Sequence, residues 1–254
     1  MKIVGIDLAT QAHNSGICVL EGNSVEFVGR GMGNLNHPGW MLQYCSNDVD
    51  FVAIDVPFGW PKPFVEALIG YEISMAFVDP GQRYQLRETD LWVRDALPRH
   101  LSRSGGPNPL SVSTDRIGAT AMVGTVLLHA LADRGFSLLP STGNRSRAAV
   151  EVYPAASLWV WHLPHKGYKK KEGEHKRREI LCGLKRLFDL RIRRCHERRL
   201  VAHDHCLDAL IAALTAQQYA NCNTFDPEGM EECTLKVEGW IRVPKGPPIG
   251  ERDA

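Results

Sequence analysis

The chain has 254 residues, of which 44% are hydrophobic and 23% are charged, and its formal net charge is +1. This composition is typical of a soluble globular protein and excludes intrinsically disordered and fibrous classes. The chain is long enough to bury a substantial core, and no linker-like segment divides it. We therefore expect a single domain over residues 1–254.

Seven cysteines are spread along the chain without a CxxC pair. A disulfide framework or a zinc module would show closely paired cysteines, so this usage indicates a reduced, cytoplasmic protein. The sequence begins with a strand-like segment and contains no apolar run of about 18 residues, so neither a signal peptide nor a membrane partner is expected.

The first quarter of the chain is predicted to be mainly β-structure. MKIVGIDLA is apolar up to Asp7, as in a buried strand. NSGICVLEG and SVEFVGRG follow at hairpin spacing around a turn at 21–23, which predicts an antiparallel meander of three strands. HPGWMLQYCSND predicts a short helix, and FVAIDVPFGWP predicts a fourth strand that ends at Asp55.

Residues 61–109 follow this strand and are rich in proline, glycine and arginine. We expect them to form an insertion or lid. A helix is expected next, capped by Thr114 or Asp115 and continuing to Leu131.

The second half is expected to supply one more strand and two helices. AAVEVYP predicts a strand, 169–190 a basic helical region, and HDHCLDALIAALTAQQYA a helix over 203–220. Residues 222–254 form a C-terminal extension that contains the strand-like EGWIRVP. This order of elements predicts the α/β class.

Asp7 and Asp55 both end strands that are predicted to be buried. Burying an ionised carboxylate without a partner in such apolar surroundings costs on the order of several kcal/mol. In an open α/β sheet, the carboxyl ends of central strands border the crevice in which ligands bind. The two aspartates are therefore expected to line a site.

The helix over 203–220 carries two more carboxylates in its first turns. At about 100° per residue, Asp204 and Asp208 lie about 40° apart, within or beside the apolar stripe that is expected to pack on the sheet. The positive end of the helix dipole stabilises negative charge there. His205 lies three residues before Asp208 and is a flanking candidate whose role the spacing leaves open.

Carboxylates from two strand ends and one helix form a set of hard oxygen ligands. Such a set suits Mg²⁺ or Mn²⁺ and does not suit structural zinc. Two such ions about 4 Å apart would support hydrolysis of a phosphodiester bond.

Five motifs in order, VGIDLA, AIDVPFGWP, RETD, VEVYPAA and LDALIAALTA, resemble the domain-of-unknown-function family 429. This group is described as predicted nucleases of ribonuclease H-like fold. The HxxD of His205 and Asp208 is similar to the terminal-helix signature of the Holliday-junction resolvase branch. The resemblance implies a mixed five-stranded sheet, with three antiparallel strands plus two parallel ones, and flanking helices.

The resemblance also implies roles for individual residues. Asp7, Asp55 and Asp208 would form the catalytic metal-binding core, with Asp204 as an adjoining ligand. Glu151 would join the catalytic group from the end of its strand.

Two residues of the RETD motif are also matched by the resemblance. Arg87 and Asp90 would form either a structural ion pair or a contact with the substrate. The motif alone leaves both roles open.

The partner expected from the charge distribution is nucleic acid, either DNA or RNA. Between Lys166 and Arg199 there are 14 of the 30 lysines and arginines but five acidic residues. A basic surface beside the carboxylates would bind phosphates in a salt-dependent way. No motif for reading base sequence is present, so base-specific recognition has no support.

The leading hypothesis is a divalent-metal-dependent nuclease that uses two metal ions. GIDLATQAHNSG also looks like the phosphate-binding turn of actin-like ATP-binding phosphotransferases, although these normally need a second such domain. A third hypothesis is a non-catalytic nucleic-acid-binding module on a degenerate nuclease fold. Resolvase-like enzymes are often homodimers, and the sequence leaves the oligomeric state open.

Overall fold

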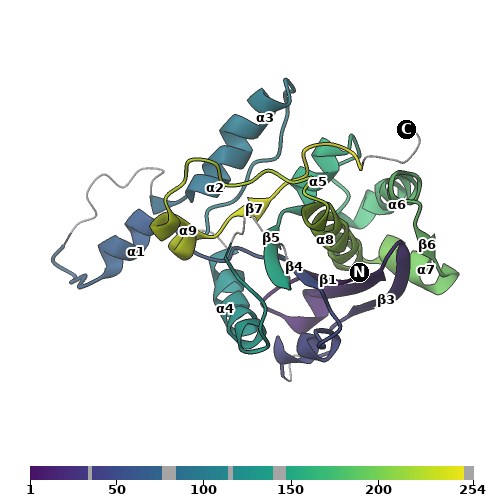
Figure 1. Ribbon diagram of the computed structural model, residues 1–254, viewed down its shortest axis with the longest axis horizontal. Coiled ribbons are helices and arrows are strands. Elements are labelled where there is room, and N and C mark those ends of the chain that lie inside the picture. Colours follow the sequence, from purple (N-terminus) through teal and green to yellow (C-terminus); the bar gives the residue numbers. More distant parts are fainter. Residues whose placement is uncertain (34–35, 76–83, 114–116, 140–146, 249–254) are drawn as a thin grey trace.

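A mixed β-sheet lies at the centre of the molecule, with helices flanking it (Figure 1). The computed structural model describes residues 1–33, 36–75, 84–113, 117–139 and 147–248. Within these residues the sheet has seven strands in the order β6-β3-β2-β1-β4-β5-β7. They are β1 (Lys2–Asp7), β2 (Gly16–Glu21), β3 (Ser24–Arg30), β4 (Phe51–Asp55), β5 (Ala148–Val152), β6 (Arg191–Ile192) and β7 (Ile241–Arg242).

The predicted meander and the α/β class are confirmed. Strands β1, β2 and β3 are antiparallel neighbours, and β4 and β5 continue the sheet parallel to β1. Gly22 occupies the turn between β2 and β3 with φ +56°, a conformation that glycine adopts without strain.

The sheet has two strands more than the five expected. Strand β6 pairs with β3 at one edge, and β7 pairs with β5 at the other. Each has only two residues, which is too short for an alternating pattern to stand out in the sequence. Two residues of EGWIRVP, Ile241 and Arg242, thus belong to the sheet.

The helices largely follow the predicted order. The prediction of a helical region over 169–190 is wrong at its start, where the chain forms a loop and a single 3₁₀ turn before α6 begins. Strand β6 and then α7 follow α6. The cap expected at Thr114 or Asp115 lies outside the described residues. The helices are η1 (Ala12–Asn14), η2 (Gly39–Tyr44), α1 (Lys62–Leu68), α2 (Glu88–Leu91), the π-helical turn η4 (Trp92–Ala96), α3 (Leu97–His100), α4 (Ile117–Asp133), α5 (Pro154–Val160), η5 (Lys171–Gly173), α6 (Glu174–Phe188), α7 (Arg194–Ala202), α8 (Asp204–Ala220) and α9 (Glu232–Glu238).

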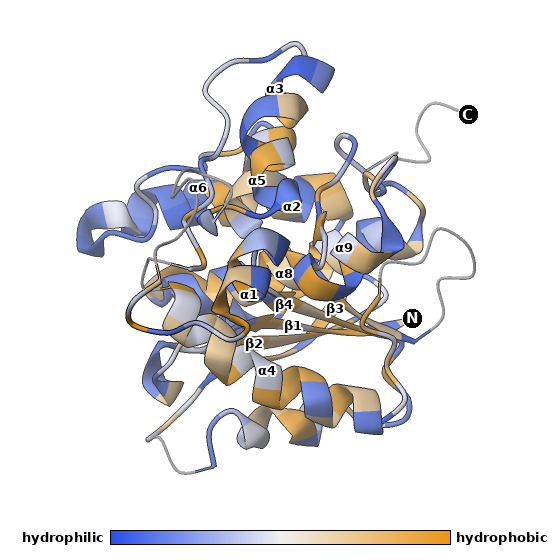
Figure 2. Cartoon of the chain, turned by 90° about the vertical axis from the view of Figure 1, so that its left-hand side faces the viewer, coloured by the Kyte–Doolittle hydropathy of each residue, from blue (hydrophilic) through white to orange (hydrophobic). Residues whose placement is uncertain are grey.

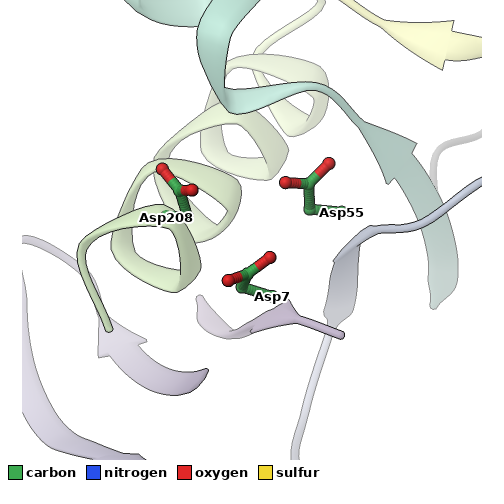
Figure 3. A group of neighbouring side chains, drawn as sticks. All are labelled: Asp7, Asp55 and Asp208. Carbon is green, nitrogen blue, oxygen red and sulfur yellow. The ribbon is translucent and has the colours of Figure 1, made fainter. Parts of the chain in front are cut away.

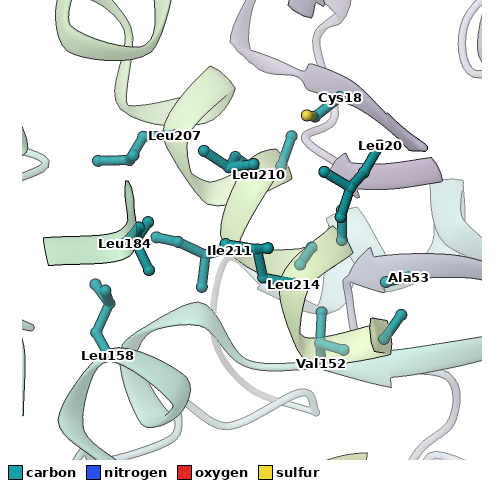
Figure 4. Packing of buried hydrophobic residues seen from close by; sticks show 14 of the residues in the cluster. Cys18, Leu20, Ala53, Val152, Leu158, Leu184, Leu207, Leu210, Ile211 and Leu214 are labelled. Atoms are coloured by element: carbon teal, nitrogen blue, oxygen red, sulfur yellow. The ribbon is translucent and has the colours of Figure 1, made fainter. Parts of the chain in front are cut away.

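Alternate residues of the central strands point into two separate cores. Ile3 and Ala53 pack on the side of α5, α6, α7 and α8, whereas Val4 and Ile54 pack on the side of α4 and η2. Figure 2 shows α8 and α4 on opposite sides of the sheet, and Figure 4 shows leucines of α8 packed against it. This period of two decides which strand-end carboxylates share a face.

Helix α8 crosses the sheet at very short range. A Cβ atom on Gly5 would lie 1.9 Å from the Ala209 carbonyl oxygen, and one on Gly16 would lie 2.1 Å from the His205 carbonyl oxygen. Every residue from Cys206 to Tyr219 is buried, so the expected single apolar stripe is in fact a helix buried on all sides. The Asp208 carboxylate on this helix therefore lies close to the ends of the strands.

No helix in the described part of the chain is long and apolar enough to cross a membrane.

Candidate metal centre

The carboxylates of Asp7, Asp55 and Asp208 converge at one end of the sheet. One oxygen from each lies within 4.8 Å of the others (Figure 3). Among the described residues, no other group of three or more potential metal ligands lies this close together. Asp208 is fully buried and Asp7 is 7% exposed, whereas Asp55 is half-buried.

Strand register explains the convergence. Asp7 and Asp55 are direct partners in the parallel pair of β1 and β4, so their side chains point to the same face. That face is covered by α8, which brings Asp208 over them from its second turn. The sequence prediction that these three residues lie together is therefore matched by the geometry.

Asp208 is held by two neighbours in consecutive positions. The Tyr168 hydroxyl donates a hydrogen bond of 2.7 Å to Asp208 Oδ1, and Lys169 Nζ lies 2.6 Å from Asp208 Oδ2. Lys169 forms an ion pair with Oδ2, and because a carboxylate oxygen has more than one acceptor site, Oδ2 keeps acceptor capacity. Burial raises the pKa of Asp208 from 3.8 to about 6, although the lysine lowers it.

The same ammonium also acts on the pKa of Asp55. Burial raises the pKa of Asp55 well above 3.8, Lys169 lowers it, and the charges of Asp7 and Asp208 raise it again. Burial lowers the pKa of Lys169, but the charges of Asp208, Asp7 and Asp55, together with Tyr168, outweigh this effect and raise it well above 10.5. The centre thus combines three acids with a lysine whose charged form they stabilise.

A buried arginine fixes the loop that carries this lysine. Arg177 of α6 donates to the backbone carbonyls of Tyr168 at 2.5 Å and Lys170 at 3.1 Å. It also donates to Val201 at the end of α7, at 2.6 Å. Arg177 is 5% exposed, so these bonds are shielded from water and hold the loop against α7.

His205 lies on the other side of the centre. Its Nδ1 is 2.7 Å from Asp7 Oδ2, and when protonated it donates a hydrogen bond to that oxygen. Burial lowers the pKa of His205, but its hydrogen bond and charge interaction with Asp7 raise it overall. Asp204, the first residue of α8, is half-buried and lies outside the three-residue group, so its role as a ligand stays a prediction.

Glu151 belongs to the opposite face of the sheet. Its register partner in β4 is Ile54, whose side chain points away from α8, and so does the side chain of Glu151. Its Oε1 accepts a bond of 2.7 Å from Arg87, and its Oε2 accepts one of 3.0 Å from the Phe58 amide. Burial raises the pKa of Glu151, while Arg87 lowers it. Glu151 is thus ion-paired and is not a member of the aspartate group.

Arg87 and Asp90 form a buried structural ion pair, one of the two alternatives that the motif left open. Two parallel bonds of 3.0 and 2.9 Å join the guanidinium to Asp90. Arg87 also donates to the Glu238 carbonyl at 2.8 Å. This pair links α2 to β5 and to the end of α9, so residues of the predicted insertion and of the C-terminal extension pack together.

Sequence reasoning missed Tyr168 and Lys169. The basic run that contains them predicts a helical, phosphate-binding region, and nothing in YKKK marks one lysine as the partner of a buried acid. Their contacts depend on how α6 and α8 pack, which the local pattern does not encode.

Comparison with known proteins places the chain in a family. No curated protein and no solved structure matches it. Residues 5–228 match the family described as "Protein of unknown function (DUF429)", and this span includes all three converging aspartates. Because the match covers most of the 254 residues, the chain belongs to the DUF429 family.

Proposed function

We propose that this protein is a divalent-metal-dependent nuclease whose sheet has a ribonuclease H-like core. The strand order β3-β2-β1-β4-β5, with an antiparallel meander followed by two parallel strands, supports this assignment. The observation that carries the proposal is the convergence of Asp7, Asp55 and Asp208 within 4.8 Å.

The donor set fits Mg²⁺ or Mn²⁺. All three candidate ligands are carboxylates, the hard oxygen donors that these cations prefer. Three carboxylates this close repel one another, and the charge of a bound cation would relieve this repulsion. When bound, such a cation would activate a water molecule and stabilise the leaving oxygen of a phosphodiester.

The neighbouring side chains orient the candidate ligands. Tyr168 fixes one oxygen of Asp208, and the second oxygen pairs with Lys169, whose place a cation could take. His205 holds one oxygen of Asp7 in the same way. Because both contacts involve partly or fully buried atoms, they preorganise the carboxylates before any ligand arrives.

The charge around the centre favours a polyanionic substrate. Lys169 has 52% of its side chain exposed, and Lys170 and Lys171 beside it are exposed. Helices α6 and α7, which follow in the chain, carry further exposed arginines. Cationic side chains of this kind bind the phosphates of nucleic acids without reading their sequence.

A cleavage assay with matched variants tests the proposal. Single-stranded, duplex and branched DNA and RNA are incubated with Mg²⁺, Mn²⁺ or chelator. We compare the wild type with Asp7→Asn and with Asp133→Asn, an exposed acid on α4. Cleavage is expected to need metal, to be lost in Asp7→Asn and to persist in Asp133→Asn.

Three outcomes would contradict the proposal. Cleavage that survives both chelation and Asp7→Asn would exclude the aspartate centre as its origin. Metal-dependent turnover of ATP without cleavage would favour a phosphotransferase. Tight, salt-sensitive binding of nucleic acid without turnover would favour a binding module.

A further inference from the structure

A cavity of about 450 Å³ opens beside the aspartate group, across the carboxyl ends of β4 and β5. Asp55 lines it directly, and Tyr168 and Lys169, the partners of Asp208, form part of its wall. Pockets that hold small ligands usually enclose about 300–1,000 Å³. The cavity can therefore hold a group of nucleobase size next to the candidate metal centre.

The walls of this cavity are mostly apolar and include aromatic rings, and the charged Arg87, Asp90 and Glu151 that also line it are paired with one another. Tyr153 and Tyr168 contribute the rings. Apolar and aromatic walls suit the flat faces of a base and do not suit a phosphate or a sugar. The apolar side chains come from several distant segments, namely Val56, Pro57, Pro109, Leu110, Ile117, Val152, Ala155 and Ile241.

One buried polar atom of a residue that lines the cavity lacks a partner. Nε2 of His165 is buried and makes no hydrogen bond. The ring interacts instead with the backbone of Gly105, while burial lowers the pKa of His165 and favours the neutral form. A neutral ring whose other nitrogen carries the proton presents Nε2 as an acceptor. Every nucleobase carries an N–H donor on its Watson–Crick edge that could satisfy such an atom.

Positive charge lies at the rim of the cavity. Lys169 and Lys170 both line it and both expose their side chains to solvent. These features match the parts of a nucleotide. The apolar interior with its unsatisfied acceptor suits the base, the cationic rim suits the phosphate, and the three carboxylates at one side suit the scissile linkage.

We propose that this cavity binds a single unstacked nucleobase and that the protein therefore acts on single-stranded or locally opened nucleic acid. This inference rests on the proposed nuclease function. A base can enter the cavity only after it leaves the stack, which costs on the order of a few kcal/mol in a paired duplex and little in a single strand. Intact duplex is accordingly a poor ligand.

A binding experiment with chelator present tests the pocket without requiring cleavage. The ligand is a single-stranded DNA decamer with 2-aminopurine at every second position, whose fluorescence reports stacking. Two further ligands are the same decamer paired with its complement and a decamer of abasic residues. Each is titrated with wild-type protein and three variants.

The variants separate the cavity from the rest of the surface. Ala155→Leu fills part of the cavity from α5, and His165→Leu removes the free acceptor. Ala132→Leu makes the same change as the first at an exposed position on α4 and serves as its control. All three full-length proteins are checked for cooperative unfolding before titration.

We expect the single strand to bind at least about tenfold more tightly than the duplex or the abasic strand, with a change in fluorescence. Ala155→Leu should weaken binding by about tenfold and His165→Leu by roughly threefold to tenfold, and Ala132→Leu should match the wild type. Equal binding by Ala155→Leu and Ala132→Leu, equal binding of single strand and abasic strand, or no binding at all would overturn the inference. A correct binding pattern without any metal-dependent cleavage would instead overturn only the nuclease function.

Discussion

Lys169 Nζ lies 2.6 Å from Asp208 Oδ2 and places a positive charge against the three converging aspartates. A divalent cation that binds there competes with this ammonium for the same oxygen. We therefore predict that Lys169→Met increases the affinity for Mn²⁺ by roughly tenfold, because a repelling charge is removed. Lys170→Met, which changes a neighbouring lysine, is the control. Unchanged or weaker affinity in Lys169→Met, measured by titration calorimetry, would show that the lysine does not compete.

The Arg87 network should contribute strongly to stability. Arg87→Met leaves the buried carboxylates of Asp90 and Glu151 without their cation, so we expect the free energy of unfolding to fall by about 3–5 kcal/mol. Arg94→Met, which breaks the more exposed pair with Asp95, should change it by about 1 kcal/mol or less. Urea denaturation measures both changes, and equal losses in the two variants would exclude this role.

The pKa of Asp208 makes stability depend on pH in the metal-free protein. Its folded value of about 6 exceeds the ordinary 3.8, so the folded state binds the proton more tightly. The resulting stabilisation is complete below 3.8 and is lost as the pH rises through about 6. Relative to Asp208→Asn, wild type should lose on the order of 3 kcal/mol over this range in chelator. A pH-independent difference would contradict this expectation.

Burial should protect three thiols from modification in the native protein. Cys18, Cys45 and Cys206 are buried, and burial raises the pKa of Cys45 and of Cys206 to about 12. At pH about 8 their thiolate fraction is then far too small to react. Titration with a disulfide reagent should modify the four exposed cysteines at once and all seven after unfolding. Rapid modification of all seven cysteines in the native protein would contradict the fold. The exposed residues are Cys182, Cys195, Cys222 and Cys233.

The aspartate group was accessible from sequence because local patterns fix its members. Asp7 and Asp55 each follow a run of buried residues, and strands of that kind align their carboxyl ends. Asp208 lies within a long apolar helix, where a buried acid needs a hydrogen-bond partner, a positive charge or a metal. These signals mark each residue separately, whereas their convergence also depends on the parallel pairing of β1 with β4.

The position of Glu151 could not be derived in the same way. Whether it joins Asp55 depends on pairing register, and a shift of one residue would move it to the other face. Its ion pair with Arg87 bridges 64 residues. The edge strands β6 and β7 and the loop with Lys169 likewise depend on packing between distant segments, which a single sequence does not reveal.

The most direct test of the account is a calorimetric titration of Mn²⁺ into chelator-stripped protein at neutral pH. Wild type and Asp133→Asn are predicted to bind Mn²⁺ with equal affinity, and Asp55→Asn to lose at least about tenfold. Asp55 is the best position for this substitution because it is the most exposed of the three aspartates and its replacement disturbs the core least. Wild-type protein that binds no Mn²⁺, or an Asp55→Asn variant that binds it as tightly as wild type, would contradict a metal centre at these aspartates.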